Sequence, residues 1–119
     1  MSKVRPQKVQ ELIKIETSQI ISREIKDPRI GFVTVTEVTV TPDLREAKIF
    51  VSLMGSDKEI AASWAGLNSA KGFVRRELGR RIRLRYTPEI EFVRDTTLDY
   101  SEHIQHLLND AHIEHDQEE

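Results

Sequence analysis

Residues 68–86 read NSAKGFVRRELGRRIRLRY, and this stretch decides how the rest of the chain is organised. Its apolar residues recur every four positions, at Val74, Leu78 and Ile82. Three of its arginines recur at a similar helical spacing, namely Arg76, Arg80 and Arg83. At about 100° per residue, the two stripes lie on nearly opposite faces of a helix. The stretch therefore predicts a helix that packs one face on a core and points guanidinium groups into solvent from the other.

The charge of this stretch is almost entirely of one sign. It holds six arginines and Lys71 against a single acid, Glu77. A solvated helix usually interleaves Glu with Arg, because pairs of opposite sign four residues apart stabilise it. We therefore favour a surface that binds a polyanion, and the competing interpretation is a solvated charged face. Gly72 follows Ala70 at the start of the pattern and predicts a bend between two helices.

Length and composition predict one domain that builds its own core. A chain of 119 residues buries about two thirds of its unfolded surface. Cysteine is absent, which excludes disulfides and cysteine nucleophiles and fits a reducing compartment. No apolar run approaches the roughly 20 residues that cross a bilayer, and no secretory signal follows the first residues. We expect a cytoplasmic protein without cofactor or small-molecule substrate, and a monomer.

The net charge of −2 hides a strong asymmetry along the chain. Lys and Arg minus Asp and Glu give +3 for residues 1–30 and −2 for residues 31–69. The same count gives +6 for residues 70–88 and −9 for residues 89–119. The local field, rather than the overall charge, indicates the partner, and a concentrated basic patch favours nucleic acid. We expect a folded region over residues 1–108 and a disordered acidic tail over residues 109–119.

Periodicity predicts the elements that surround the basic stretch. A helix begins at Pro6 and ends before Asp27-Pro28, because proline disfavours a helical conformation in the residue before it. Alternating Val and Thr predict a strand over residues 32–41, with a bulge near Thr36-Glu37 where the alternation slips. A second strand carries Ala47, Ile49, Val51 and Leu53 on one face, and the short connection favours an antiparallel hairpin.

The remaining elements follow from capping and alternation. Ser56 and Glu59 form a capping-box pattern that begins a helix running to Leu67. Residues 89–93 predict a short strand with Ile90 and Phe92 inward, and Thr97 caps a last helix. The order predicts an α+β fold: a three-stranded sheet covered by helices on one face, followed by a C-terminal helix.

Motifs of catalysis are missing from the sequence. It has no glycine-rich phosphate loop, no G-x-S-x-G and no H-E-x-x-H. The histidines form two pairs spaced three residues apart, which is compatible with metal ligands: His103 and His106, then His112 and His115. The second pair falls in the tail that we expect to be disordered, which favours solvated histidines, so we expect neither a metal site nor an enzyme.

Nucleic-acid binding has better candidates. Arginine offers bidentate contacts to phosphate oxygens, and helix N-termini favour phosphate. The candidate RNA-binding residues are Lys71, Arg75, Arg76, Arg80, Arg81 and Arg83, extended by Lys3, Arg5 and Lys8. Phe73 and Tyr86 are the candidate stacking aromatics, but we assign both to the core. Without stacking platforms, we expect recognition of a structured RNA by its shape and backbone.

Several long motifs, in order, resemble the ribosome-binding factor A family of bacterial small-subunit assembly factors. They are DPRI at 27–30, VTVTEV at 33–38, TPDLREAKIFVS at 41–52, LNSAKGFVRRELGRRIRLRYTPEIEF at 67–92 and the D-x-x-L-D-Y-S-E-H-I segment at 95–104. The resemblance covers about residues 3–108. It implies a type II KH-like fold in which Ala70-Lys71-Gly72 forms a kink where a typical KH domain has a G-x-x-G loop.

The resemblance also implies a function. Its members bind the 30S subunit and its 16S rRNA, assist late maturation including 5′-end processing, support growth in the cold and are not enzymes. An alternative from another class is a protein-interaction module, which docks a ribosome-associated protein through the acidic C-terminal region or an open sheet edge. The two hypotheses differ in whether the arginines or the acidic end carry binding.

Overall fold

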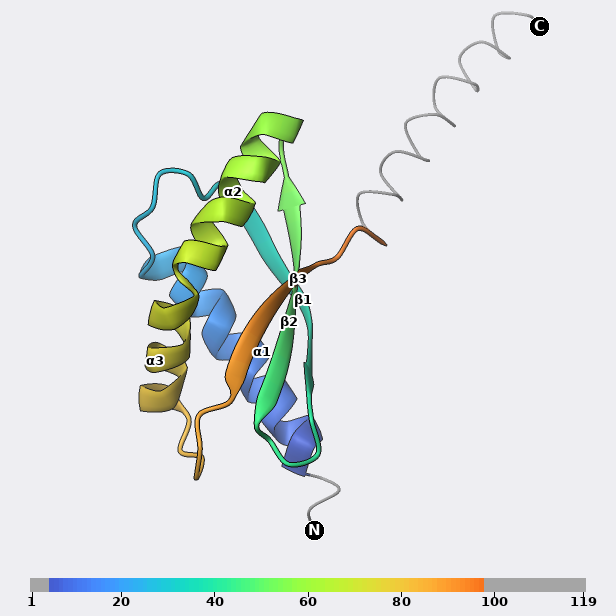
Figure 1. Cartoon of the computed structure of the whole chain (residues 1–119), viewed down its shortest axis with the longest axis vertical. Coiled ribbons are helices and arrows are strands. Elements are labelled where there is room, and N and C mark those ends of the chain that lie inside the picture. The colour runs from blue at the N-terminus through green and yellow to red at the C-terminus, as the bar shows by residue number, and fades with distance from the viewer. Residues whose placement is uncertain (1–4, 98–119) are drawn as a thin grey trace, which may run out of the picture.

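The computed structural model describes residues 5–97, and its side chains are described from Pro6 onward. The elements follow in the order α1 (Arg5–Arg23), β1 (Phe32–Val40), β2 (Glu46–Met54), α2 (Asp57–Ser69), α3 (Lys71–Arg81) and β3 (Glu89–Arg94). The predicted helix–strand–strand–helix–helix–strand order is confirmed (Figure 1). The predicted last helix from Thr97 and the tail over residues 109–119 lie outside the described residues.

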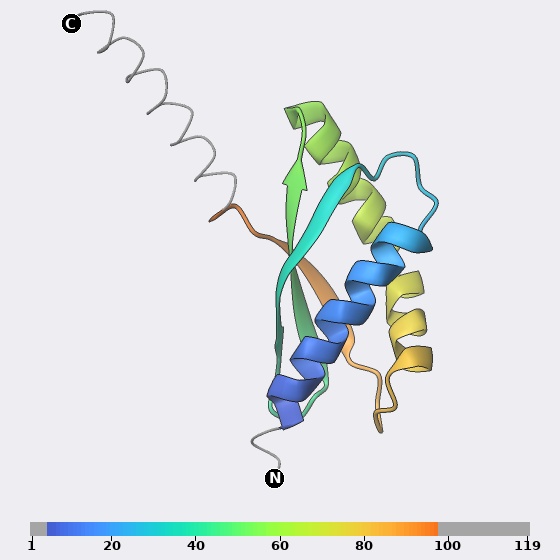
Figure 2. The same ribbon diagram turned by 180° about the vertical axis from the view of Figure 1, so that it is seen from behind.

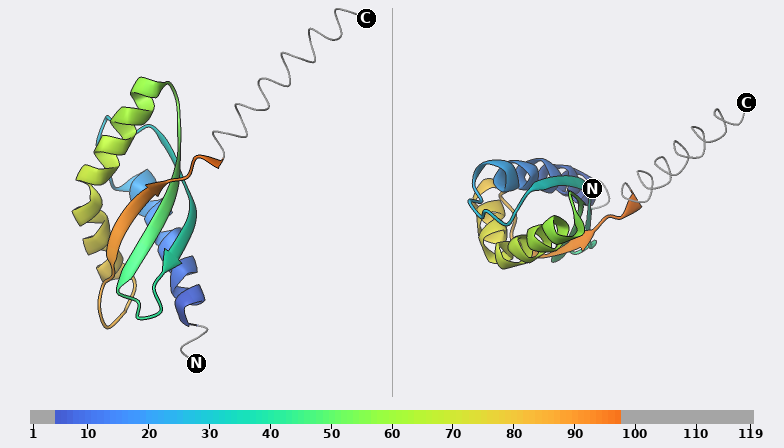
Figure 3. Two further views of the ribbon diagram at one scale, coloured as in Figure 1. Left: turned by 45° about the vertical axis from the view of Figure 1, so that its right-hand side comes forward. Right: turned by 90° about the horizontal axis from the view of Figure 1, so that it is seen from above.

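One three-stranded sheet, in the order β1-β2-β3, supports the helices. β1 and β2 pair antiparallel, as the short connection predicts, while β2 and β3 pair parallel. The crossover from β2 to β3 is the α2–α3 pair, because parallel strands need a long connection. In Figure 2, which views the molecule from behind, α1 crosses in front of the sheet. Figure 3 shows α2 and α3 beside the strands.

The bulge predicted in the first strand is present. The register of β1 against β2 shifts between Val35 and Glu37, which leaves Thr36 as the extra residue. The shift allows Val35 and Val38, which have opposite parity in the sequence, both to be buried. A bulge therefore repairs the slipped alternation of the sequence.

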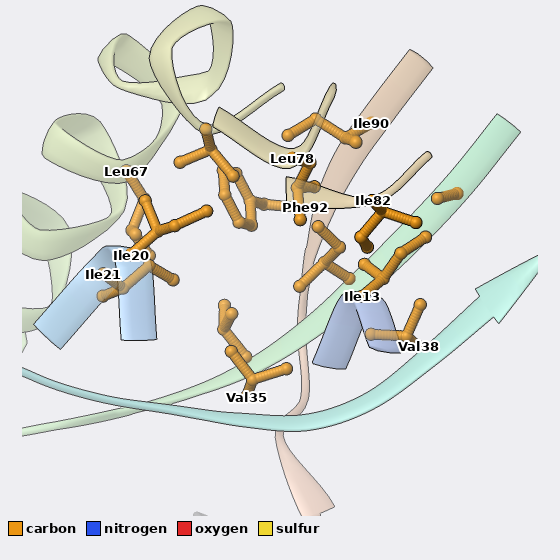
Figure 4. Packing of buried hydrophobic residues seen from close by; sticks show 14 of the residues in the cluster. Ile13, Ile20, Ile21, Val35, Val38, Leu67, Leu78, Ile82, Ile90 and Phe92 are labelled. Atoms are coloured by element: carbon orange, nitrogen blue, oxygen red, sulfur yellow. The ribbon is translucent and has the colours of Figure 1, made fainter. Parts of the chain in front are cut away.

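The core lies between the sheet and the three helices (Figure 4). α1 contributes Ile13 and Ile20, and the inward face of β2 is buried from end to end. The three apolar residues of the basic stretch are also buried, as predicted: Val74, Leu78 and Ile82. Their burial fixes which way α3 presents its arginines.

The helices α2 and α3 meet at a bend visible in Figure 1. Ser56 and Glu59 form the predicted capping box at the start of α2. Ala70 stands at the joint with φ −87° and ψ 0°, between the helical and extended regions. Its N–H still donates to the carbonyl of Gly66 at 3.0 Å, and its carbonyl accepts from Val74 N at 2.9 Å. The joint is therefore a kink in continuous helix, not a loop.

The predicted extension of the basic helix to Tyr86 is wrong. α3 ends at Arg81, and Ile82 adopts an extended conformation with φ −116° and ψ 120°. The chain leaves the helix there because it must return to the start of β3, where Glu89 N donates to the carbonyl of Arg45 at 2.8 Å. Ile82 stays buried in this conformation, so the core keeps it without a further helical turn.

Candidate nucleic-acid interface

Three cations project into solvent from α3. Lys71, Arg76 and Arg80 are all exposed, and the apolar residues of the same helix face the core. Arg80 donates to the Glu77 carboxylate at 3.0 Å, but its own side chain is 75% exposed. A surface pair of this kind is weak, so Arg80 remains able to exchange Glu77 for a phosphate.

Arg75 has a different environment from its neighbour Arg76. Its Nε donates to the carbonyl of Pro88 at 3.1 Å and its Nη2 to the carbonyl of Thr87 at 3.0 Å. An ion pair with Glu89 at 3.3 Å adds a third contact. The guanidinium thus ties α3 to the segment that enters β3, and its predicted RNA-binding role stays a prediction.

Arg81 lies in a cluster of carboxylates. It pairs with Glu16 at 3.2 Å, with Glu24, and with Glu77 at 3.8 Å. Its side chain is only 24% exposed. Because Glu16 lies in α1 and Glu24 directly follows that helix, the local sequence around Arg81 gives no sign of them. This arginine joins α1 to α3, and its predicted contact with RNA stays untested.

The structure separates Arg83 from the stripe predicted for it. Because α3 ends at Arg81, the exposed Arg83 lies in the loop beyond the helix and not one turn after Arg80. Lys8 is exposed on α1, two residues before Gln10, whose Oε1 accepts from Val40 N at the end of β1 at 3.0 Å. Lys3 lies outside the described residues, and so does the side chain of Arg5.

Sequence reasoning missed a second cationic group beside Arg83. Tyr86 is 54% exposed, so its assignment to the core is wrong. The Arg45 and Arg85 guanidinium carbons lie 5.0 and 5.8 Å from the centroid of its ring. Arg45 comes from the β1–β2 hairpin, so only the fold brings it here. Phe73, in contrast, is half-buried and packs against the core, as predicted.

Ala70 and Gly72, the two residues predicted to form the kink, differ in their positions relative to the bend. The bend is at Ala70, whereas Gly72 lies in the first turn of α3. A Cβ built on Gly72 would meet nothing within 4 Å, and its φ lies outside the left-handed region. The fold of the described residues therefore gives no steric reason for glycine at this position.

The perturbed carboxyl groups in the described region belong to turns and caps. The Arg29 guanidinium lowers the pKa of Asp27, the Thr41 hydroxyl lowers the pKa of Asp43, and the Thr36 hydroxyl lowers the pKa of Asp95. Backbone and side-chain hydrogen bonds from Ser56 likewise lower the pKa of Glu59. Each lowered pKa favours an ionised structural acceptor, whereas a general acid at neutral pH needs a raised one.

Neither a metal centre nor a membrane span is found in residues 5–97. No group of three or more His, Cys, Asp or Glu side chains there is placed to hold a metal ion. None of the helices there has the length and apolar character to cross a bilayer. The histidine pairs at 103/106 and 112/115 lie outside this region.

Comparison with known proteins identifies relatives over almost the whole chain. The family described as Ribosome-binding factor A matches residues 5–108. Ribosome-binding factor A of Brevibacillus brevis is 47% identical over 114 residues, which cover 96% of this chain and 94% of that protein.

Solved structures show the same fold. The crystal structure of ribosome-binding factor A from Thermus thermophilus is 25% identical, covers 75% of this chain and 94% of its own, and has a TM-score of 0.64. A homology model of the Thermus thermophilus factor, fitted into a cryo-electron microscopy map of its 30S complex, is 23% identical with a TM-score of 0.61. It covers 72% of this chain and 90% of its own. The expected KH-like α+β architecture is confirmed.

Proposed function

Because this chain belongs to the ribosome-binding factor A family, we propose that it binds the small ribosomal subunit and contacts 16S rRNA through the exposed cations of α3 and the loop after it. The proposed contact surface, called the basic face below, consists of Lys71, Arg76, Arg80 and Arg83. In the complex described for the Thermus thermophilus relative, the partner is the 30S subunit.

The observation that carries this proposal is that some cations of the basic stretch are bonded within the fold while others are exposed to solvent. Within the fold, Arg75 donates to backbone carbonyls, and Arg81 pairs with the carboxylates of Glu16 and Glu24. The four residues of the basic face are exposed, and within residues 5–97 Arg80 alone among them forms an ion pair. Exposed guanidinium and ammonium groups of this kind suit phosphate oxygens.

We propose that the protein acts by binding alone, in the cytoplasm, as a monomer and without a cofactor or catalytic step. A factor that binds one arrangement of an RNA more tightly than another shifts the RNA towards that arrangement. Applied to a maturing small subunit, this binding would favour a late assembly state and its 5′-end processing, particularly in the cold. A deletion strain should then accumulate 16S precursor and grow poorly at low temperature, and normal 16S termini in such a strain would refute this role.

Co-sedimentation with isolated 30S subunits tests the basic face. The variant Arg76→Glu/Arg80→Glu/Arg83→Glu reverses three exposed charges. The control variant Arg23→Glu/Lys26→Glu/Lys58→Glu makes the same charge change at exposed positions off the basic face. Circular dichroism checks that both variants fold. We expect wild type and the control to sediment with the subunit and the triple variant to remain in the supernatant.

The other outcomes separate the parts of the proposal. If the folded triple variant sediments as well as wild type does, the protein binds the small subunit through another surface. If wild type itself fails to sediment with 30S subunits, the proposed partner is wrong.

A protein-interaction module is the second candidate function, supported by an exposed apolar pair. Phe32, 80% exposed, lies opposite Met54 in the β1–β2 register. An exposed apolar patch of this kind is typical of protein–protein contacts. If Phe32→Ser or removal of residues 109–119 abolishes co-sedimentation while the arginine variant retains it, this function is favoured over RNA binding.

A further inference from the structure

A small pocket lies where the β1–β2 hairpin meets the loop between α3 and β3. The hairpin lines one side of the pocket with Asp43, Leu44 and Arg45. The loop lines the other side with Leu84, Arg85 and Tyr86. Both loops are at the lower end of the molecule in Figure 1. The cavity holds about 320 Å³, within the range of small-ligand sites.

The two walls of the pocket are built alike. Each wall has a leucine that packs partly against the core, Leu44 on the hairpin and Leu84 on the loop. Each leucine is followed directly by an exposed arginine, Arg45 or Arg85. The anchored leucines hold both backbones in place. Glu89 N, just after the loop, donates to the carbonyl of Arg45 at 2.8 Å and so joins this part of the chain to the hairpin. The site is therefore largely formed before any ligand arrives, which reduces the entropy lost on binding.

The exposed side chains of the pocket have the chemistry of a nucleotide site. Tyr86 offers an aromatic surface, and the two guanidinium groups lie 5.0 and 5.8 Å from its ring centroid. Cation–π attraction restrains the three side chains together. Unpaired bases stack on tyrosine rings and on guanidinium planes, while guanidinium N–H groups bind phosphate.

The charges of the lining favour an anion that also carries a flat ring. The lining contains two guanidinium groups and one carboxylate, that of Asp43. That carboxylate already accepts from the Thr41 hydroxyl at 2.6 Å and from Arg45 N at 3.1 Å, so it is used in shaping the turn. Arg83, on the basic face, precedes Leu84 by one residue, so a chain of nucleotides bound at the basic face can continue into the pocket.

We propose that this pocket binds one unpaired nucleotide of RNA, with its base stacked on the Tyr86–arginine cluster and its phosphate held by Arg45 or Arg85. This inference rests on the proposed RNA-binding function. It adds single-stranded recognition to the shape and backbone recognition of the basic face. It predicts that the protein distinguishes single-stranded from double-stranded RNA at this site.

Fluorescence anisotropy with two labelled RNAs tests the pocket. One probe is a single-stranded RNA octamer of mixed sequence, and the other is a hairpin RNA closed by a stable duplex. Tyr86→Ala removes the ring, Tyr86→Phe retains it, and Arg45→Gln removes one guanidinium. Arg76→Gln is the matched control, because it removes one exposed cation from α3. Thermal unfolding checks each variant, since the exposed Tyr86 side chain is not needed for the core.

Loss of one stacked base lowers affinity by about fivefold or more. We expect Tyr86→Ala to weaken octamer binding by at least about fivefold, with Tyr86→Phe close to wild type and hairpin binding little changed. We expect Arg45→Gln to weaken the octamer more than the hairpin, and Arg76→Gln to weaken both RNAs alike.

Two results would overturn the inference in distinguishable ways. If Tyr86→Ala and Arg45→Gln bind the octamer like wild type while Arg76→Gln weakens both RNAs, the basic face stands and the pocket is not a nucleotide site. If wild type binds neither RNA and does not sediment with 30S subunits, the proposed function and the pocket both fail.

Discussion

Arg80 and Arg81 are adjacent in the sequence and have opposite surroundings. Arg80 is largely exposed beside Glu77, whereas Arg81 pairs with Glu16 on α1 and with Glu24 just beyond that helix. Shortening a half-buried arginine leaves carboxylates without their partner, which costs more than losing a surface pair.

Replacing each of these arginines by alanine tests this difference. We expect Arg81→Ala to lower the free energy of unfolding by about 1–3 kcal/mol. The control Arg80→Ala should change it by less than about 0.5 kcal/mol. Urea denaturation followed by circular dichroism measures both. Equal effects of the two substitutions would show that the carboxylates of Glu16 and Glu24 do not stabilise the fold through Arg81.

Thr36, the bulged residue of β1, has a titratable partner. Its hydroxyl donates to Asp95 Oδ2 at 2.7 Å, and Thr97 N donates to the other carboxylate oxygen at 2.9 Å. The Thr36 bond is the main cause of the lowered pKa of Asp95. A pKa lowered in the folded state adds stability above the unfolded value of about 3.9 and loses it as the pH falls through the folded pKa.

The variant Thr36→Val should therefore have a pH-dependent effect. We expect it to be less stable than wild type at pH 7, and we expect the difference to shrink as the pH falls below about 4. Thermal unfolding of both proteins between pH 3 and pH 7 measures this. A difference that is constant across the range would show that the bond does not act through the ionised Asp95.

At the scale of elements, α3 contains two glycines with different surroundings. A Cβ on Gly72 would meet open space, whereas a Cβ on Gly79 would lie 2.6 Å from Thr87 Oγ1. Thr87 has little freedom to move, because its carbonyl is held by Arg75 and its side chain is branched at Cβ. Helix α3 therefore needs a small residue where it passes the loop into β3, and not at its start.

Alanine at each glycine tests that interpretation. Gly72→Ala should raise the free energy of unfolding by up to about 1 kcal/mol, because glycine is a poor helix former. Gly79→Ala gains the same propensity but should be destabilised overall, since overpacking costs about 1–3 kcal/mol. Chemical denaturation of both variants gives the comparison. A stabilised Gly79→Ala variant would mean that Thr87 moves aside without cost.

At the scale of the whole molecule, the fold sorts the cations into those that hold elements together and those that are free to meet a polyanion. Arg75 and Arg76 are adjacent members of the two groups. The logarithm of the affinity of a protein for RNA falls linearly with the logarithm of the salt concentration. The slope is proportional to the number of phosphates that the protein neutralises.

The salt dependence of 30S binding therefore distinguishes the two arginines. Arg76→Gln should reduce the slope of log affinity against log salt by about 0.7–0.9 and leave stability unchanged. Arg75→Gln should leave the slope nearly unchanged and lower the free energy of unfolding by about 1–2 kcal/mol, because two carbonyls lose a charged donor. An unchanged slope for Arg76→Gln would exclude that residue from the contact.

Local sequence patterns predicted most of the elements and the core. Periodicity predicted the buried stripe of α3, the slipped alternation of β1 predicted its bulge, and Ser56 with Glu59 predicted the start of α2. These features depend on neighbours within a few residues, so a local pattern contains the information. The motifs of the family also led to the KH-like architecture that the solved relatives share.

The end of the basic helix and the exposure of its cations depend instead on contacts between distant parts of the chain. α3 stops at Arg81 because the chain must return to pair β3 with β2, a constraint set about 35 residues earlier by Glu46 and its neighbours. Two partners of Arg81 come from α1 and the residue after it, Glu16 and Glu24, and Arg45 reaches Tyr86 from the hairpin. Contacts of this kind join residues far apart in the chain, where periodicity and spacing carry no signal.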